Sequence, residues 1–137
     1  MHRAHTHAIS IAAPVEIVFD LVSDPTRLPR WAPAFARTVR QDGDAWIVDS
    51  GERQARIRIR ASREHGTVDF LLVCASAVEV GAFSRVVPNR CGTEFVFTQF
   101  FADGTSERDL EDKRAVIAME LQIVRALCER SAGAAAA

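Results

Sequence analysis

Polar side chains that could act on a bound molecule are few in this sequence. His7 lies in an alternating segment, where it shares one face with two isoleucines, and this pattern points it inward. An inward histidine could serve as a general base or as a hydrogen-bond donor. A histidine at a strand end, or one paired with a neighbour, would give the same pattern. Gln99 alternates with Phe97, so it is expected to be a polar group among inward aromatic side chains.

The sequence contains no motif that would identify a reaction. It has no nucleophile elbow, no glycine-rich phosphate loop, no HExxH motif and no tyrosine. Further polar groups of a possible inner surface are Glu79, Ser84 and Arg85. Whether the protein is an enzyme is therefore left open at this point.

Histidines and cysteines do not form a pattern typical of metal sites. His2, His5 and His7 alternate near the N-terminus, but no carboxylate or cysteine accompanies them, so no metal and no cofactor are expected. The three cysteines form no CxxC pair and no signal peptide precedes them, which predicts reduced thiols and a cytoplasmic location. Cys74 and Cys128 are expected in the core.

Aromatic and aliphatic side chains are better candidates for ligand contact. Trp31 stands between two prolines, and Phe35 is spaced to share its face. An aromatic side chain where the chain passes from the helical region to the sheet could close over an apolar ligand. It could also fill the core beneath a short helix.

The elements that must position these side chains are mainly strands. Residues 5–11 alternate as a strand, residues 15–22 carry a helical apolar stripe, and residues 26–35 form a second short helix or turn broken by prolines. Six strands are then expected, with turn signals between them and no intervening helix. Their ranges are 37–41, 45–49, 53–61, 67–73, 77–87 and 93–101.

Two of these strands show which face is buried. In residues 53–61 Ile57 lies on an apolar face, and Arg56, Arg58 and Arg60 lie on the other. We expect the arginine face in solvent, although it could also bind an anion or a partner. For residues 77–87 the two faces are nearly equal in apolar character, so the pattern does not choose between them.

The last segment organises the chain. Apolar residues recur with helical spacing over residues 107–130, and Ile117 and Leu121 lie within this stripe. A helix of this length would be about 36 Å long and would cross a domain of this size. A long helix after a run of strands predicts an α+β fold with a curved antiparallel sheet around it. Residues 1–131 are expected to form one domain, and residues 132–137 a disordered tail.

Composition excludes several classes of protein. The chain has 137 residues and a net charge of −1, which does not favour nucleic acid or an anionic membrane. No apolar run reaches the ~18 residues of a membrane span.

The order of elements and three segments resemble the START-like, or SRPBCC, superfamily. The segments are residues 7–24 (HAISIAAPVEIVFDLVSD), residues 27–33 (RLPRWAP) and residues 92–98 (GTEFVFT), and they look like polyketide cyclase/dehydrase-type members. The resemblance implies a helix-grip fold, with a seven-stranded antiparallel sheet wrapped on a long C-terminal helix and two short helices after the first strand. It also implies an apolar cavity between the sheet and the last helix.

Three functions follow from this reading. The first is binding of a small hydrophobic or aromatic molecule by a monomer or homodimer, with Trp31, His7, Phe35, Ile57, Phe97, Gln99, Ile117 and Leu121 around it. The second is a polyketide cyclase/aromatase-like enzyme in which His7 and Gln99 contact a poly-ketone or aromatic substrate. The third is an interaction module that uses the arginine face or a sheet edge.

Overall fold

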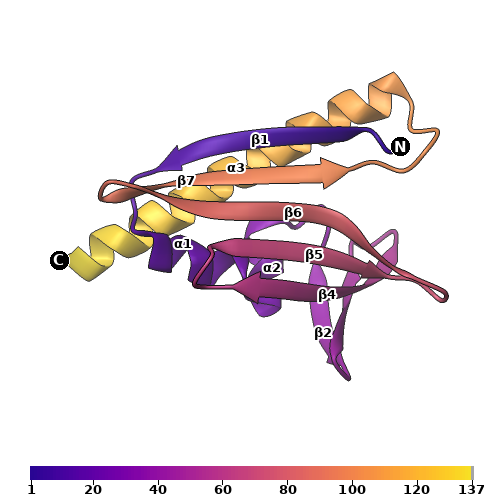
Figure 1. Ribbon diagram of the computed structural model, residues 1–137, viewed down its shortest axis with the longest axis horizontal. Coiled ribbons are helices and arrows are strands. Elements are labelled where there is room, and N and C mark those ends of the chain that lie inside the picture. Colours follow the sequence, from indigo (N-terminus) through magenta and orange to yellow (C-terminus); the bar gives the residue numbers. More distant parts are fainter. Residues whose placement is uncertain (137) are drawn as a thin grey trace.

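The computed structural model describes residues 1–136, which form one antiparallel sheet and a set of helices (Figure 1). Strand β1 (Ala4–Ile11) is followed by helix α1 (Val15–Val22), the 3-10 turn η1 (Pro25–Arg27) and helix α2 (Leu28–Trp31). The next six elements are β2 (Thr38–Asp42), β3 (Ala45–Asp49), β4 (Gln54–Ser62), β5 (Thr67–Val73), β6 (Val78–Asn89) and β7 (Gly92–Phe100). The last element is helix α3 (Glu107–Ala136). The helix-grip fold expected from the resemblance is confirmed.

The seven strands have the spatial order β1-β7-β6-β5-β4-β3-β2. Within residues 1–136 only the pairing of β1 with β7 joins strands distant in sequence, and it sets His7 opposite Phe97 and Ile9 opposite Phe95. Phe95 and Phe97 are buried, so the predicted inner face of the last strand is confirmed. The long-range pair brings the N-terminus beside the start of α3, where Arg3 and Glu107 form an ion pair.

Helix α3 covers the inner face of the sheet along β1 and β7, with α1 and α2 beside it (Figure 1). The predicted apolar stripe is confirmed, because its central residues are at most 2% exposed: Leu110, Ile117, Leu121, Val124 and Cys128. Ser106 caps the helix, since its side-chain oxygen accepts a hydrogen bond from the Asp109 amide at 3.1 Å.

One expectation about helix lengths was wrong and another is confirmed. Helix α3 does not end at Arg130 but continues to Ala136, because the alanine-rich sequence that was read as a tail has the highest intrinsic helix propensity. Residue 137, also assigned to that tail, lies outside the described residues. The segment 26–35 is helical as far as Trp31 and continues as turns, which confirms the expected short helix or turn broken by prolines.

A β-bulge in β6 explains why its two faces looked alike in the sequence. Phe70 pairs with Ala82 but Leu71 pairs with Val80, so Gly81 is an extra residue in β6. Ala82, Ser84 and Val86 are buried after the bulge, whereas Val78 and Val80 before it are exposed. The face that covers the interior therefore changes in the middle of the strand.

Strand β6 also extends beyond its expected end at Val87. Pro88 pairs with Thr93 of β7, although a turn was predicted to begin at Pro88. The pairing of β6 with β5 stops at Arg85, so the amide hydrogen that proline lacks is not needed on that side.

Gly66, in the turn between β4 and β5, should tolerate substitution poorly. It has a φ of +67°, and a Cβ atom there would lie 2.4 Å from the Val86 carbonyl oxygen. Gly43 has a similar φ of +64° with no atom within 4 Å of the same position. We expect Gly43→Ala to lower the unfolding free energy by ~1 kcal/mol and Gly66→Ala by roughly 3 kcal/mol in urea denaturation. Equal losses in the two variants would contradict the steric argument.

Candidate ligand-binding cavity

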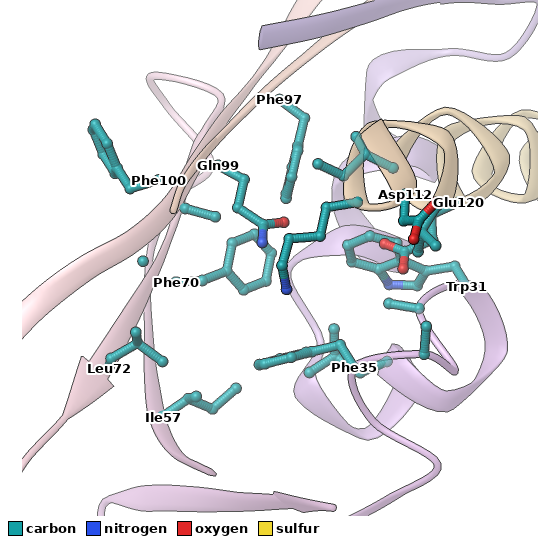
Figure 2. A pocket seen from close by; sticks show the side chains of 18 residues that line it. Trp31, Phe35, Ile57, Phe70, Leu72, Phe97, Gln99, Phe100, Asp112 and Glu120 are labelled. Atoms are coloured by element: carbon teal, nitrogen blue, oxygen red, sulfur yellow. The ribbon is translucent and has the colours of Figure 1, made fainter. Parts of the chain in front are cut away.

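A cavity of about 360 Å³ lies between the inner face of the sheet, helix α2 and helix α3. Its walls are largely apolar and include the rings of Trp31, Phe70 and Phe97 (Figure 2). These rings contact one another, since the Trp31 and Phe70 centroids are 6.2 Å apart and the Phe70 and Phe97 centroids are 6.1 Å apart. A cavity of this volume accommodates a small organic molecule, and its aromatic walls suit a flat one.

Six of the eight side chains expected around a ligand line this cavity. They are Trp31, Phe35, Ile57, Phe97, Gln99 and Ile117. The Gln99 amide points into the cavity, whereas the neighbouring Phe100 ring points away from it (Figure 2). Ligand contact by these six residues stays a prediction.

The other two expected residues, His7 and Leu121, do not line the cavity. Leu121 is fully buried, and it belongs to the part of the α3 stripe that packs as core. His7 lies on β1, which packs against α3, and its ring centroid is 6.0 Å from that of His5. Because β1 is an edge strand on the far side of β7 from the cavity, an inward direction alone did not bring His7 to it.

Glu120 is a functional candidate that the sequence reading missed. Its residue is only 7% exposed, it lines the cavity from α3, and it forms no hydrogen bond or ion pair with residues 1–136. Burial raises the pKa of its carboxyl group to about 7. A signal was present, because Glu120 lies three residues after Ile117 and four before Val124, within the helical apolar stripe.

Trp31 contributes a second polar group without a partner. The residue is 2% exposed, and within the described part of the chain its indole Nε1 has no hydrogen-bond acceptor. A buried N–H without an acceptor is rare in folded proteins. The unpaired indole N–H thus lies within the packed wall of α2, whereas the Glu120 side chain lines the cavity from α3.

The remaining charged groups of the cavity wall are Asp112 and Lys113 of α3. Both are exposed, as are Ala34 and Phe35 across from them. These four residues form the open side, and Glu120 and Trp31 belong to the buried side. Asp112 and Lys113 were also missed, because their positions at the solvent edge of the stripe are those of ordinary surface residues.

The arginine face of β4 is neutralised by aspartates. Arg56 contacts Asp42 at 2.6 Å, Arg58 contacts Asp44 at 3.1 Å and Arg60 contacts Asp69 at 2.7 Å. Arg60 is exposed, and Arg56 and Arg58 are half-buried among their neighbours on this face. With an acidic partner on each, this face offers no concentrated positive charge for an anion.

No cysteine is among the residues that line this cavity in the described part of the chain. Cys128 is buried and its pKa is raised to about 11 by burial, whereas Cys74 is exposed. The expectation that Cys74 is a core residue was wrong, because β5 ends at Val73. Across residues 1–136 no three His, Cys, Asp or Glu side chains gather in a way that could hold a metal ion. No helix among these residues has the length and apolar character needed to cross a membrane.

Comparison with known proteins identifies a family model that matches residues 2–127, nearly the whole chain; it is described as polyketide cyclase / dehydrase and lipid transport. No curated protein matches the sequence.

Solved structures of similar fold include the ZhuI aromatase/cyclase from Streptomyces sp. R1128, at 14% identity and a TM-score of 0.71, with 95% of each chain covered. The Aha1 dimer from Colwellia psychrerythraea has 12% identity and a TM-score of 0.71, over 93% of this chain and 96% of that one. A protein from Thermobifida fusca has 21% identity and a TM-score of 0.69, over 93% of each chain. At these identities the likeness shows the fold.

Glu120 should make stability depend on pH in a way that a glutamine does not. Its carboxyl pKa is about 7 in the folded protein against a model value of 4.5, so between these values the folded state holds a proton that the unfolded state has lost. Stability therefore falls as pH rises through this window, by on the order of 3 kcal/mol. We expect Glu120→Gln to lose this dependence in urea denaturation, whereas exposed Glu111→Gln should keep it. Parallel pH profiles for Glu120→Gln and the wild type would contradict the assignment.

Proposed function

The chain belongs to the polyketide cyclase/dehydrase and lipid transport family, and we propose that it binds a small hydrophobic or aromatic molecule in the cavity between its sheet and helix α3. The observation that carries this proposal is the cavity of about 360 Å³ with aromatic rings on its walls. Ligand pockets commonly start at ~300 Å³ and are lined by apolar and aromatic side chains with a few polar groups. Trp31, Phe70 and Phe97 supply the rings, and their buried faces would stack on a flat ligand.

A cyclase/aromatase-like activity is the second candidate function. The fold shared with the ZhuI aromatase/cyclase supports it, and so does a buried carboxyl group whose pKa is about 7. A general acid or base works best when its pKa lies near the operating pH. In this enzymatic mechanism Glu120 has the role that the sequence analysis gave to His7. Gln99 remains a polar contact with a poly-ketone or aromatic substrate.

Ligand binding can be tested by thermal unfolding with a panel of flat aromatic polyketides, flavonoids, sterols and fatty acids. A ligand present at 100 times its dissociation constant adds ~2.7 kcal/mol of stability, which raises the Tm of a domain of this size by several degrees. Ala82→Phe places a ring into the cavity from the floor formed by β6, so it should abolish the shift. Ala8→Phe makes the same change at an exposed position of β1 and should leave the shift intact.

The variants separate binding in the cavity from binding elsewhere. A ligand-dependent shift that survives in a folded Ala82→Phe protein would place the ligand outside the cavity. Absence of any shift across the panel would count against the proposal. Turnover of a poly-ketone substrate that disappears in Glu120→Gln, with ligand binding retained, would favour the enzyme over the carrier.

A further inference from the structure

Glu120 presents a carboxyl group to the cavity without a partner in the protein. The residue is 7% exposed, and it makes no hydrogen bond or ion pair with residues 1–136. The polar side-chain atoms of the described chain that are both enclosed and unpartnered are Trp31 Nε1, Arg58 Nε and Arg114 Nε. The Glu120 oxygens are not among these enclosed atoms, and the side chain lines the cavity (Figure 2). The carboxyl group is therefore removed from bulk solvent but accessible to a molecule in the cavity.

The charge of the cavity wall is negative in balance. Within the described part of the chain, the charged residues that line it are Asp112, Lys113 and Glu120. Asp112 and Lys113 are exposed neighbours at the open side, so their opposite charges offset each other. At the buried side, the ionised carboxylate of Glu120 has no positive group of the wall beside it. An unpaired charge in an apolar environment is unfavourable, so a cation that enters this side gains from pairing with it.

We propose that the cavity binds a protonated amine with an aromatic body, and that the ammonium group of this ligand pairs with the Glu120 carboxylate. This inference rests on the proposed binding function and specifies the ligand class of the same cavity. The aromatic body lies against the rings of Trp31, Phe70 and Phe97, and the ammonium N–H groups donate hydrogen bonds to the carboxylate oxygens. The Gln99 amide points into the same cavity (Figure 2) and offers a further acceptor.

The aromatic walls favour an ammonium group as well as an apolar body. The face of an aromatic ring carries partial negative charge and attracts a cation, most strongly where water is excluded. The three rings form a contiguous cluster, with centroid separations of 6.2 and 6.1 Å. Folding has already removed Glu120 from solvent, so of the two charges only the ammonium group has to be desolvated on binding.

Ligands of other charge fit this arrangement less well. A carboxylate, such as that of a fatty acid, would bring a second negative charge beside Glu120, and the Lys113 ammonium group that could balance it lies at the exposed side. A neutral ligand leaves the carboxylate without a counter-charge, although an alcohol can donate a hydrogen bond to it. The preference for an amine over an alcohol of the same shape therefore measures the contribution of the charge.

Ionisation of Glu120 makes this binding depend on pH. Burial raises the pKa of its carboxyl group to about 7, so the carboxylate predominates above this pH and is lost below it. Between about pH 6 and pH 8 the ionised fraction increases roughly tenfold, and amine affinity should increase with it, because binding releases the carboxyl proton. The other charged or titratable groups on the surrounding elements are Asp112 and Lys113 of α3, Arg30 of α2, Glu16 and Asp20 of α1, His5 and His7 of β1 and Glu79 of β6.

The test compares naphthylmethylamine with naphthalenemethanol, which has a neutral hydroxyl in place of the ammonium group, and with naphthoic acid, an anion of similar size. Isothermal titration calorimetry in two buffers of different ionisation enthalpy measures the affinity and the protons released on binding. At about pH 8 we expect the wild type to bind the amine on the order of tenfold more tightly than the alcohol. At about pH 6 the amine should bind several-fold more weakly and release a proton from Glu120, whereas the alcohol should release none.

Two variants separate the acids of the cavity wall. Glu120→Gln keeps the shape of the side chain but cannot ionise, so it should lower amine affinity at about pH 8 on the order of tenfold, abolish the proton release and leave alcohol affinity unchanged. Asp112→Asn makes the same change in charge at the open side and should lower amine affinity by less than about twofold, because solvent screens that position. The comparison of amine with alcohol needs only the wild-type protein, so the inference stays testable if Glu120→Gln does not fold.

The outcomes distinguish the inference from the binding function on which it rests. Alcohol binding as tight as amine binding in the wild type would overturn the inference and leave the binding function intact. Loss of amine affinity in Asp112→Asn, with Glu120→Gln unchanged, would also overturn it, since the ammonium group would then lie at the open side. Tightest binding of naphthoic acid would do the same. Binding of none of the three probes would count against the proposed function itself and against the inference with it.

Discussion

A single long helix has to cover the inner face of a seven-stranded sheet, and the rest of the structure depends on this constraint. Strands lie about 4.8 Å apart and a helix is ~10 Å across, so one helix covers only about two strands. Helix α3 packs against β1 at the sheet edge. The short helices α1 and α2 cover part of the remaining face, and the space between α2, α3 and strands β4–β7 is the cavity. The cavity is thus a consequence of the element lengths.

The same helix provides both core and cavity wall, and this explains how a buried acid is kept in place. Leu121 and Val124 are fully buried, and they fix the rotation of α3 about its axis. Glu120 precedes Leu121 directly, so its Cα–Cβ bond points towards the interior as long as these side chains stay in the core. The packing of the stripe therefore stabilises an unfavourable position for one carboxyl group, which is a common arrangement at functional sites.

Sequence patterns predicted the fold well because the relevant signals are local and repetitive. The alternation in β4 and β7, the helical stripe of α3 and the prolines around Trp31 each determine an element with little help from the rest of the chain.

The site was predicted less completely. Gly81 shifts the alternation of β6 by one residue, and the nearly equal apolar character of the two faces was the only sign of this shift that the sequence reading noted. His7 was placed on the correct face but at the wrong distance, since facing inward does not say which strand adjoins the cavity. Glu120 was visible in the stripe as an acid among apolar residues, but only the cavity gives that position a meaning.

Backbones of similar shape at 12–21% identity indicate that the fold is maintained by apolar patterning that many sequences satisfy. Function then depends on the few polar side chains that a given member places on the cavity wall. In this chain the group by which a carrier and an enzyme would differ is Glu120. A carrier needs one protonation state of this carboxyl group while the ligand is bound, whereas an enzyme that moves protons must pass through both. A pKa of about 7 keeps both states accessible near neutral pH, so the same buried carboxyl group suits a hydrogen bond to a bound molecule and proton transfer to or from one.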